Sequence, residues 1–283
     1  AKMHLEKAIA AYDELNAHRF VEEYGSDPKA ISLVMLGIAH AYSGFPDQAA
    51  AFVDKAISHA DKLSFPFVTA WVHWMATWMF RDLGELEQTE KHATAQLQIA
   101  LEKNFSPMKQ GASIISGWVQ YRQNIPNSLE KIELGFQQLL DLGPNFAYWE
   151  QKYIIDYIDA FGRESHIEKA KQKIDRAFHL IETQGAKWNL PEILRRKAIM
   201  CMAETESNSA EAESIFLDSL DLARNQNSKL SELCTGISLA RFWGEGQERQ
   251  KAYDLLFPIY DWYTEGFKTA HLKEANELLG QLQ

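Results

Sequence analysis

The sequence predicts an all-α protein, built as a solenoid of about six stacked helix-turn-helix units. Turn-forming residues recur at Gly44, Gly84, Asn124, Gly162, the loop at 206–208 and Gly246, with separations of 40, 40, 38, 44 and 40 residues. An apolar stripe with helical spacing follows each of these turns. A helical pair of this kind has an apolar face that it cannot bury alone, so neighbouring pairs must stack against it.

The stretch from Asp27 to Leu63 shows the layout of one unit. Asp27 and Pro28 open its first helix, because aspartate is a good N-cap and proline loses nothing at the first helical position. The turn at 44–47 leads into a second helix with an apolar face. We expect one domain over 1–283, with units at about 27–64, 65–105, 106–143, 144–186, 187–227 and 228–267 and a capping helix at 269–282. Before the first unit, apolar spacing predicts one helix over 5–17.

Composition and charge exclude several classes of protein. The net charge is −10 and no basic stripe is present, which argues against binding of nucleic acid. No apolar run approaches the length of a membrane span, and the N-terminus has no signal-peptide pattern. Cys201 and Cys234 occupy core-like helical positions, so we expect reduced, buried thiols. A cytoplasmic protein fits these features.

Motifs for catalysis and for cofactors are missing. The nine histidines are scattered, without the spacing of a metal site. The sequence has no phosphate-binding loop and no nucleophile elbow of the Gly-x-Ser-x-Gly type. We therefore expect no catalytic residue, no metal and no cofactor in this chain.

The helical pairs resemble tetratricopeptide repeats, with small residues such as Gly37 and Gly117 in the first helices. The period is longer, about 40 residues against about 34 in that family. Two stretches resemble the TPR-like C-terminal region of large bacterial predicted ATPases, many of them fused to adenylate/guanylate cyclase domains. They are residues 24–28 with 44–49, and residues 256–267.

This resemblance implies a right-handed α-α superhelix whose first helices present side chains to a concave surface. It also implies that the chain is the C-terminal part of a longer protein, with the catalytic domains elsewhere. No catalysis is implied within these residues.

The first helices are rich in aromatic residues, which are good anchors at interfaces. Core packing explains helix-spaced tryptophan and tyrosine equally well, and both explanations can hold on different faces of one helix. The candidate partner-binding residues are Trp74, Trp78, Tyr121, Trp149 and Tyr153.

We expect a non-catalytic interaction or regulatory module that binds a protein or peptide segment, or another domain of its parent chain, in the concave groove. The alternative is a small-molecule sensor or a hydrolytic enzyme with a pocket between repeats. That pocket would include His73, Trp118, Asp156 or Tyr157. The sequence leaves homo-oligomerisation open.

Overall fold

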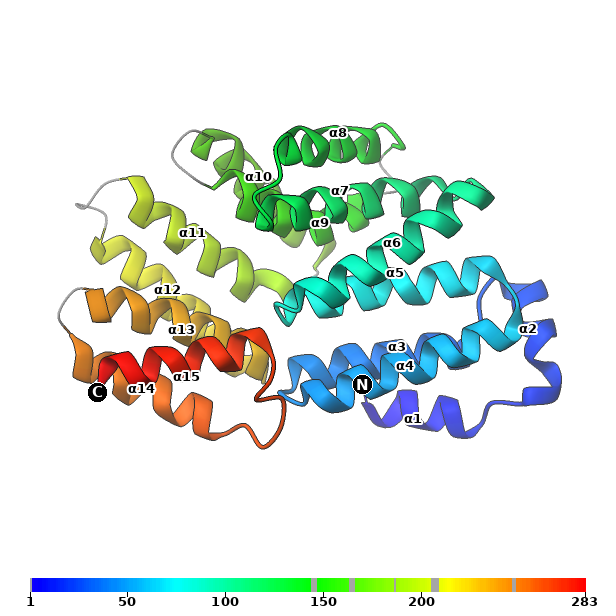
Figure 1. Cartoon of the computed structure of the whole chain (residues 1–283), viewed down its shortest axis with the longest axis horizontal. Coiled ribbons are helices and arrows are strands. Elements are labelled where there is room, and N and C mark those ends of the chain that lie inside the picture. The colour runs from blue at the N-terminus through cyan, green and yellow to red at the C-terminus, as the bar shows by residue number, and fades with distance from the viewer. Residues whose placement is uncertain (1, 144–146, 163–165, 186, 205–208, 246–247) are drawn as a thin grey trace.

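The computed structural model describes residues 2–143, 147–162, 166–185, 187–204, 209–245 and 248–283, and all regular structure in these ranges is helical (Figure 1). The α-helices are α1 (Lys2–Ala10), α2 (Ala17–Tyr24), α3 (Pro28–Tyr42), α4 (Pro46–Leu63), α5 (Pro66–Asp82), α6 (Leu86–Lys103), α7 (Ser106–Arg122), α8 (Ser128–Leu140), α9 (Ala147–Phe161), α10 (Ile167–Gln184), α11 (Leu190–Glu204), α12 (Ser209–Asn225), α13 (Lys229–Glu245), α14 (Arg249–Asp261) and α15 (Ala270–Leu282). Two 3-10 helices, η1 (Glu14–Asn16) and η3 (Lys187–Asn189), precede α2 and α11.

From α3 to α14 the helices pack in adjacent pairs, which confirms the all-helical, repeat-like architecture. The first pair shows why the sequence forms it. Asp27 caps α3, since its carboxylate accepts a hydrogen bond from the backbone N–H of Ala30 at 2.7 Å. Gly44 then turns the chain with a φ of +87°, which favours glycine. The 206–208 and Gly246 turn positions lie outside the described residues.

The N-terminal segment differs from the single helix expected over 5–17. Helix α1 ends at Ala10, and the chain turns at Asp13. The Asp13 carboxylate accepts hydrogen bonds from the backbone N–H of Leu15 at 3.0 Å and from the Asn16 side chain at 2.6 Å. These local bonds compete with helix continuation, so the prediction of one helix was wrong.

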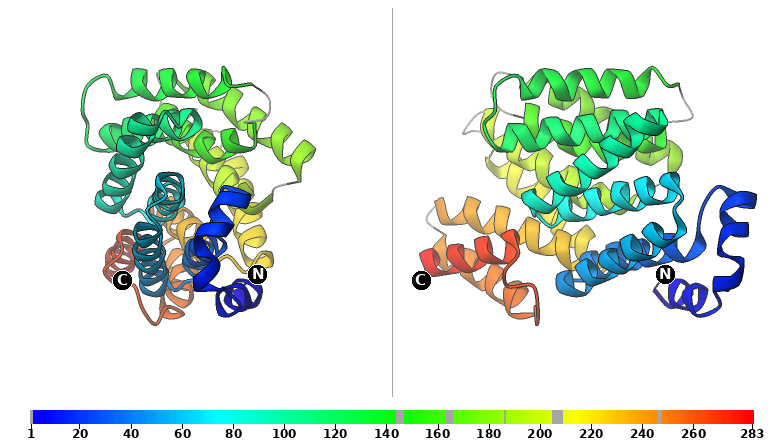
Figure 2. Two further views of the ribbon diagram at one scale, coloured as in Figure 1. Left: turned by 90° about the vertical axis from the view of Figure 1, so that its right-hand side faces the viewer. Right: turned by 45° about the vertical axis from the view of Figure 1, so that its right-hand side comes forward.

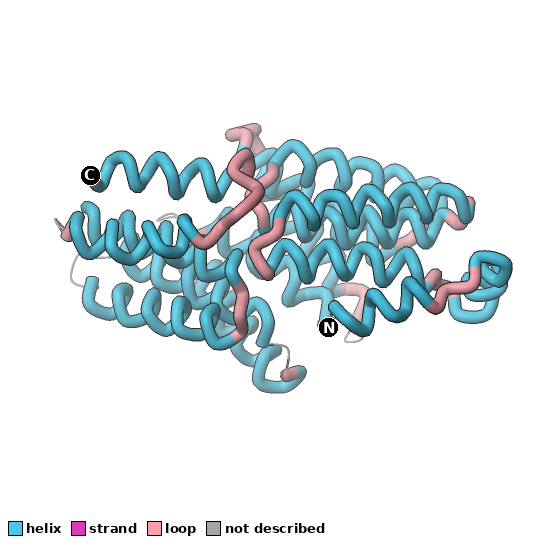
Figure 3. The backbone as a smooth tube through the Cα atoms, turned by 90° about the horizontal axis from the view of Figure 1, so that it is seen from below, coloured by secondary structure: helices cyan, strands magenta, loops and turns pink. Residues whose placement is uncertain are grey.

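The arc of helical pairs closes on itself. The loop between α14 and α15 lies against the turns that follow α3 and α5, as the views of Figures 1, 2 and 3 show. Gln48 donates two hydrogen bonds to the Glu265 carboxylate, at 3.0 and 2.9 Å. The backbone N–H of Gly266 donates to Asp47 at 3.0 Å. We call these contacts, made by residues 44–48 and 82–85 with residues 262–271, the closing seam.

Apolar and steric contacts complete the closing seam. The rings of Phe45 and Trp262 lie 5.8 Å apart. A Cβ on Gly266 would lie 2.0 Å from the Pro46 ring, so only glycine fits there. The two stretches that carry the family resemblance thus contact each other across the seam.

Candidate functional site

A large cavity opens on the inner side of the arc, between the first helices of the pairs. Its volume is about 820 Å³. We call it the aromatic pocket and define it by the residues that line it: Ile31, Met35, Ile38, Tyr42, Ser43, Trp71, Met75, Trp78, Trp149, Lys152, Lys187, Trp188, Gln226, Asn227 and Ser228. On α3 and α5 the lining residues follow helical spacing, so each helix offers one continuous face to the pocket.

Two residues that line the pocket, Trp78 and Trp149, belong to an aromatic cluster with the buried Trp74 and Tyr153. The Trp74 ring lies 4.6 Å from Trp149 and 5.2 Å from Trp78, and Trp78 lies 5.8 Å from Tyr153. The indole N–H of Trp74 donates a hydrogen bond to the Tyr153 hydroxyl. The Tyr153 hydroxyl lies close to Gly111, and a Cβ at Gly111 would be only 1.9 Å from the hydroxyl oxygen.

The five candidate partner-binding residues therefore have different environments. Trp74, Trp78 and Tyr153 are core residues, exposed by only 3%, 2% and 0%. Trp149 is partly exposed and lines the aromatic pocket. Tyr121 lies apart from these four and lines a second cavity. Of the five, Trp149 offers the most surface to a ligand at the pocket.

Lys152 is the charged group at the centre of the pocket. Its ammonium lies 3.4 Å from the ring centre of Trp188 and 4.8 Å from that of Trp78, in cation–π contact with both. Among the described residues, none forms a hydrogen bond or ion pair with this nitrogen. Burial lowers the pKa of Lys152 to about 7, with Asp82 and Arg81 acting in opposite directions.

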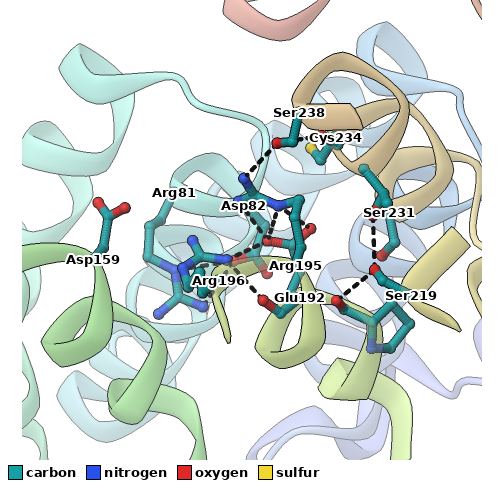
Figure 4. A network of polar contacts seen from close by, with 12 residues as sticks. Arg81, Asp82, Asp159, Glu192, Arg195, Arg196, Ser219, Ser231, Cys234 and Ser238 are labelled. Carbon is teal, nitrogen blue, oxygen red and sulfur yellow. Dashed lines mark hydrogen bonds and ion pairs between the residues drawn. The ribbon is translucent and has the colours of Figure 1, made fainter. Parts of the chain in front are cut away.

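A second, polar cavity of about 340 Å³ lies beside the aromatic pocket, and Figure 4 shows the polar network around it. We call it the polar chamber. It is lined by Tyr42, Arg81, Asp82, Gly84, Trp118, Tyr121, Arg122, Asp159, Glu192, Arg195, Arg196, Leu230, Ser231, Cys234, Ala270, His271 and Glu274. The lining includes residues of α15, which reach the chamber across the closing seam.

The charged side chains around the polar chamber form ion pairs. Arg81 donates to Asp156 at 2.6 Å and to Asp82 at 2.7 Å. Its guanidinium also donates to the backbone carbonyl of Lys152 at 2.8 Å, which links the chamber to the helix that carries the pocket lysine. Burial raises the pKa of Asp156 to about 7 although Arg81 favours its charged form.

A second charged group stands on α11. Glu192 accepts hydrogen bonds from Arg195, at 2.9 Å, and from Arg196. Burial favours the neutral acid, but the two guanidinium groups outweigh it and lower the pKa of Glu192 to about 2.

Tyr42 separates the two cavities. Its hydroxyl donates to the Asp82 carboxylate at 2.6 Å on the polar side. Its ring meets that of Trp188 edge to face, with centroids 6.1 Å apart. One side chain thus forms a wall of both cavities.

The residues of the alternative pocket do not meet in one place. Trp118 lines the polar chamber and donates to Asp159 at 2.8 Å, and Asp156 pairs with Arg81. His73 instead contacts His92, with 2.9 Å between the two Nδ1 atoms. Tyr157 stacks on Phe161 with ring centres 4.2 Å apart.

The sequence pattern did not single out Lys152 or Trp188. Lys152 follows Trp149 by three positions on the same helix, which places both on one face. That spacing beside a tryptophan was the available signal for the lysine.

The described ranges hold no candidate metal site. No group of three or more histidine, cysteine, aspartate or glutamate side chains there could hold a metal ion. Cys201 and Cys234 are both buried. No described helix is both long and apolar enough to cross a bilayer.

Comparison with models of protein families gives no match for this chain, and no curated protein matches its sequence. The likeness to TPR-like regions of predicted ATPases therefore stays a prediction.

Proposed function

We propose that the chain is a non-catalytic sensor module whose aromatic pocket binds a small molecule. The observation that carries this proposal is the pocket itself, about 820 Å³ in volume and walled by tryptophan, methionine and isoleucine side chains. Binding sites for small molecules are usually clefts of about 300 to 1,000 Å³, mostly apolar, with a few polar groups. The aromatic pocket has this size and composition.

Binding of a protein segment in the concave groove has less structural support than binding of a small molecule. The closing seam joins the first and last pairs, so the inner side of the arc is enclosed at that point. Three of the five aromatic residues expected to anchor such a segment are buried. A peptide end could enter the aromatic pocket, but an extended segment along the whole arc would have to open the seam.

The finer features of the module belong to the same proposal. They are a right-handed superhelix, a cytoplasmic location, and attachment to a longer signalling protein with an ATPase or cyclase domain. The resemblance of residues 24–28, 44–49 and 256–267 to such proteins supports them.

Thermal unfolding in the presence of a metabolite library tests the proposal. A ligand at a hundred times its dissociation constant stabilises the folded state by about 2.7 kcal/mol, which is measurable as a higher melting temperature. We expect at least one compound to raise the melting temperature of the wild-type chain. Met35 lines the pocket, so the larger side chain of Met35→Trp should fill part of the pocket and abolish the shift in melting temperature.

Ile199→Trp is the matched control. Ile199 is exposed to a similar degree on α11 and lines neither of the two cavities. The control should keep the wild-type shift. An equal loss in both variants, or no shift with any compound, would contradict a ligand site in the aromatic pocket.

A further inference from the structure

The aromatic pocket has a charge opposite to that of the molecule. The chain carries a net charge of −10, yet the charged residues that line this pocket are Lys152 and Lys187, with no aspartate or glutamate among the described lining residues. A pocket with cations and no carboxylate attracts anions.

The ammonium of Lys152 has N–H donors that make no hydrogen bond to the described residues. Its contacts are the faces of Trp78 and Trp188, which attract the positive charge but leave the N–H groups without an acceptor among the described residues. A partly buried cation that no carboxylate contacts is costly, and a bound anion would offset that cost. The pocket therefore offers N–H donors to an acceptor at this nitrogen.

The walls around Lys152 are fixed in place. The Gln226 side chain donates to the backbone carbonyl of Lys187 at 2.9 Å and so holds the 3-10 helix that carries Trp188. From the other side, Arg81 holds the backbone carbonyl of Lys152. A ligand thus meets a preformed site, which lowers the entropic cost of binding.

The neighbouring polar chamber differs from the aromatic pocket because carboxylates line it together with its cations. Arg81, Arg195 and Arg196 each pair there with an aspartate or glutamate. An anion in the chamber would compete with these carboxylates for the arginines, whereas no carboxylate of the described residues contacts the Lys152 ammonium.

We propose that the ligand of the aromatic pocket is a small organic anion, with a flat apolar body among the tryptophans and a carboxylate bound to Lys152. This inference rests on the proposed function, since it names the ligand class of the same pocket. A cationic ligand is disfavoured because the Lys152 ammonium already occupies the faces of Trp78 and Trp188 that would receive it.

Two probes of equal shape test the inference. They are 2-naphthoate and its neutral amide, 2-naphthamide, titrated against the full chain by calorimetry at pH 6. A charge-assisted hydrogen bond should make the wild-type chain bind the naphthoate at least about tenfold more tightly than the amide. Lys152→Met should remove this preference and keep the affinity for the amide.

A pH series and a second variant guard against a misfolded Lys152→Met. Near pH 9 Lys152 is largely neutral because its pKa is about 7, so the wild-type preference should fall while the naphthoate stays ionised. Lys152→Arg should keep the preference at pH 9, since arginine remains protonated. Lys197→Met is the matched control, because Lys197 also lies over an aromatic ring, that of Phe178, but lines neither cavity.

The outcomes separate the two proposals. Equal binding of both probes by the wild-type chain would overturn the anion inference and leave the pocket standing. The same holds for a preference that Lys152→Met keeps. Binding of neither probe would contradict the inference and would count against the proposed function as well.

Discussion

The two cavities on the inner side of the arc share Tyr42 as a wall, but they differ in whether their cations are paired with carboxylates. In the polar chamber the cations have carboxylate partners, such as Asp156 for Arg81 and Glu192 for Arg195 and Arg196. In the aromatic pocket Lys152 has only tryptophan rings. The Arg81–Asp156 pair joins α5 to α9, whereas Lys152 is left as a cation ready for a ligand.

Removing one cation from each cavity is the strongest test of this contrast. Arg81→Met leaves the fully buried Asp156 without its partner, so we expect a loss of about 3 to 5 kcal/mol in the free energy of unfolding. Lys152→Met leaves no carboxylate without its partner, so it should lower the free energy of unfolding by less than about 1 kcal/mol. Urea unfolding of both variants measures the difference. Similar losses would show that Lys152 is as structural as Arg81.

A weaker effect is expected from the closing seam, on which the α15 side of the polar chamber depends. Gly266 and Gly185 both have a left-handed backbone, with φ of +78° and +72°. Gly185→Ala should cost about 1 kcal/mol from the backbone alone, since nothing lies within 4 Å of its Cβ position. Gly266→Ala should cost about 1 to 3 kcal/mol more, because its Cβ would strike Pro46. Equal losses in urea unfolding would mean that the seam adds no stability.

A further effect concerns pH. Lys152 is only partly buried and its pKa falls from 10.5 to about 7 on folding. Between these values the unfolded chain binds the proton and the folded chain does not, so the contribution of Lys152 to stability rises with pH. Unfolding measured at pH 6.5 and pH 9 should show a larger rise for the wild-type chain than for Lys152→Met. A parallel dependence in both proteins would argue that Lys152 keeps an ordinary pKa.

Much of the fold could be predicted because it is encoded locally. Gly44, Gly84 and Asn124 all have positive φ and end the first helix of a pair, as their spacing indicated. The end of α1 was missed because the side chain of Asp13 bonds the backbone locally, which apolar spacing does not record.

The site was harder to predict than the fold, since it depends on contacts between distant parts of the chain. The aromatic residues of α5 and α9 were singled out, but spacing alone could not tell the buried Trp74 from the partly exposed Trp149. Lys152 looked like one more solvated residue on a helix, because its tryptophan neighbours belong to α5 and η3. Trp188 stands outside the apolar stripes that define the repeats.

The closing seam also bears on how the protein unfolds. In an open array each unit contacts only its neighbours, so a terminal unit can melt while the rest stays folded. Here the Gln48–Glu265 and Asp47–Gly266 contacts join segments more than two hundred residues apart, so that fraying at either end also breaks contacts of the other. We therefore expect the helical pairs to unfold in one cooperative transition. The closing seam would couple the stability of the first pair to that of the last.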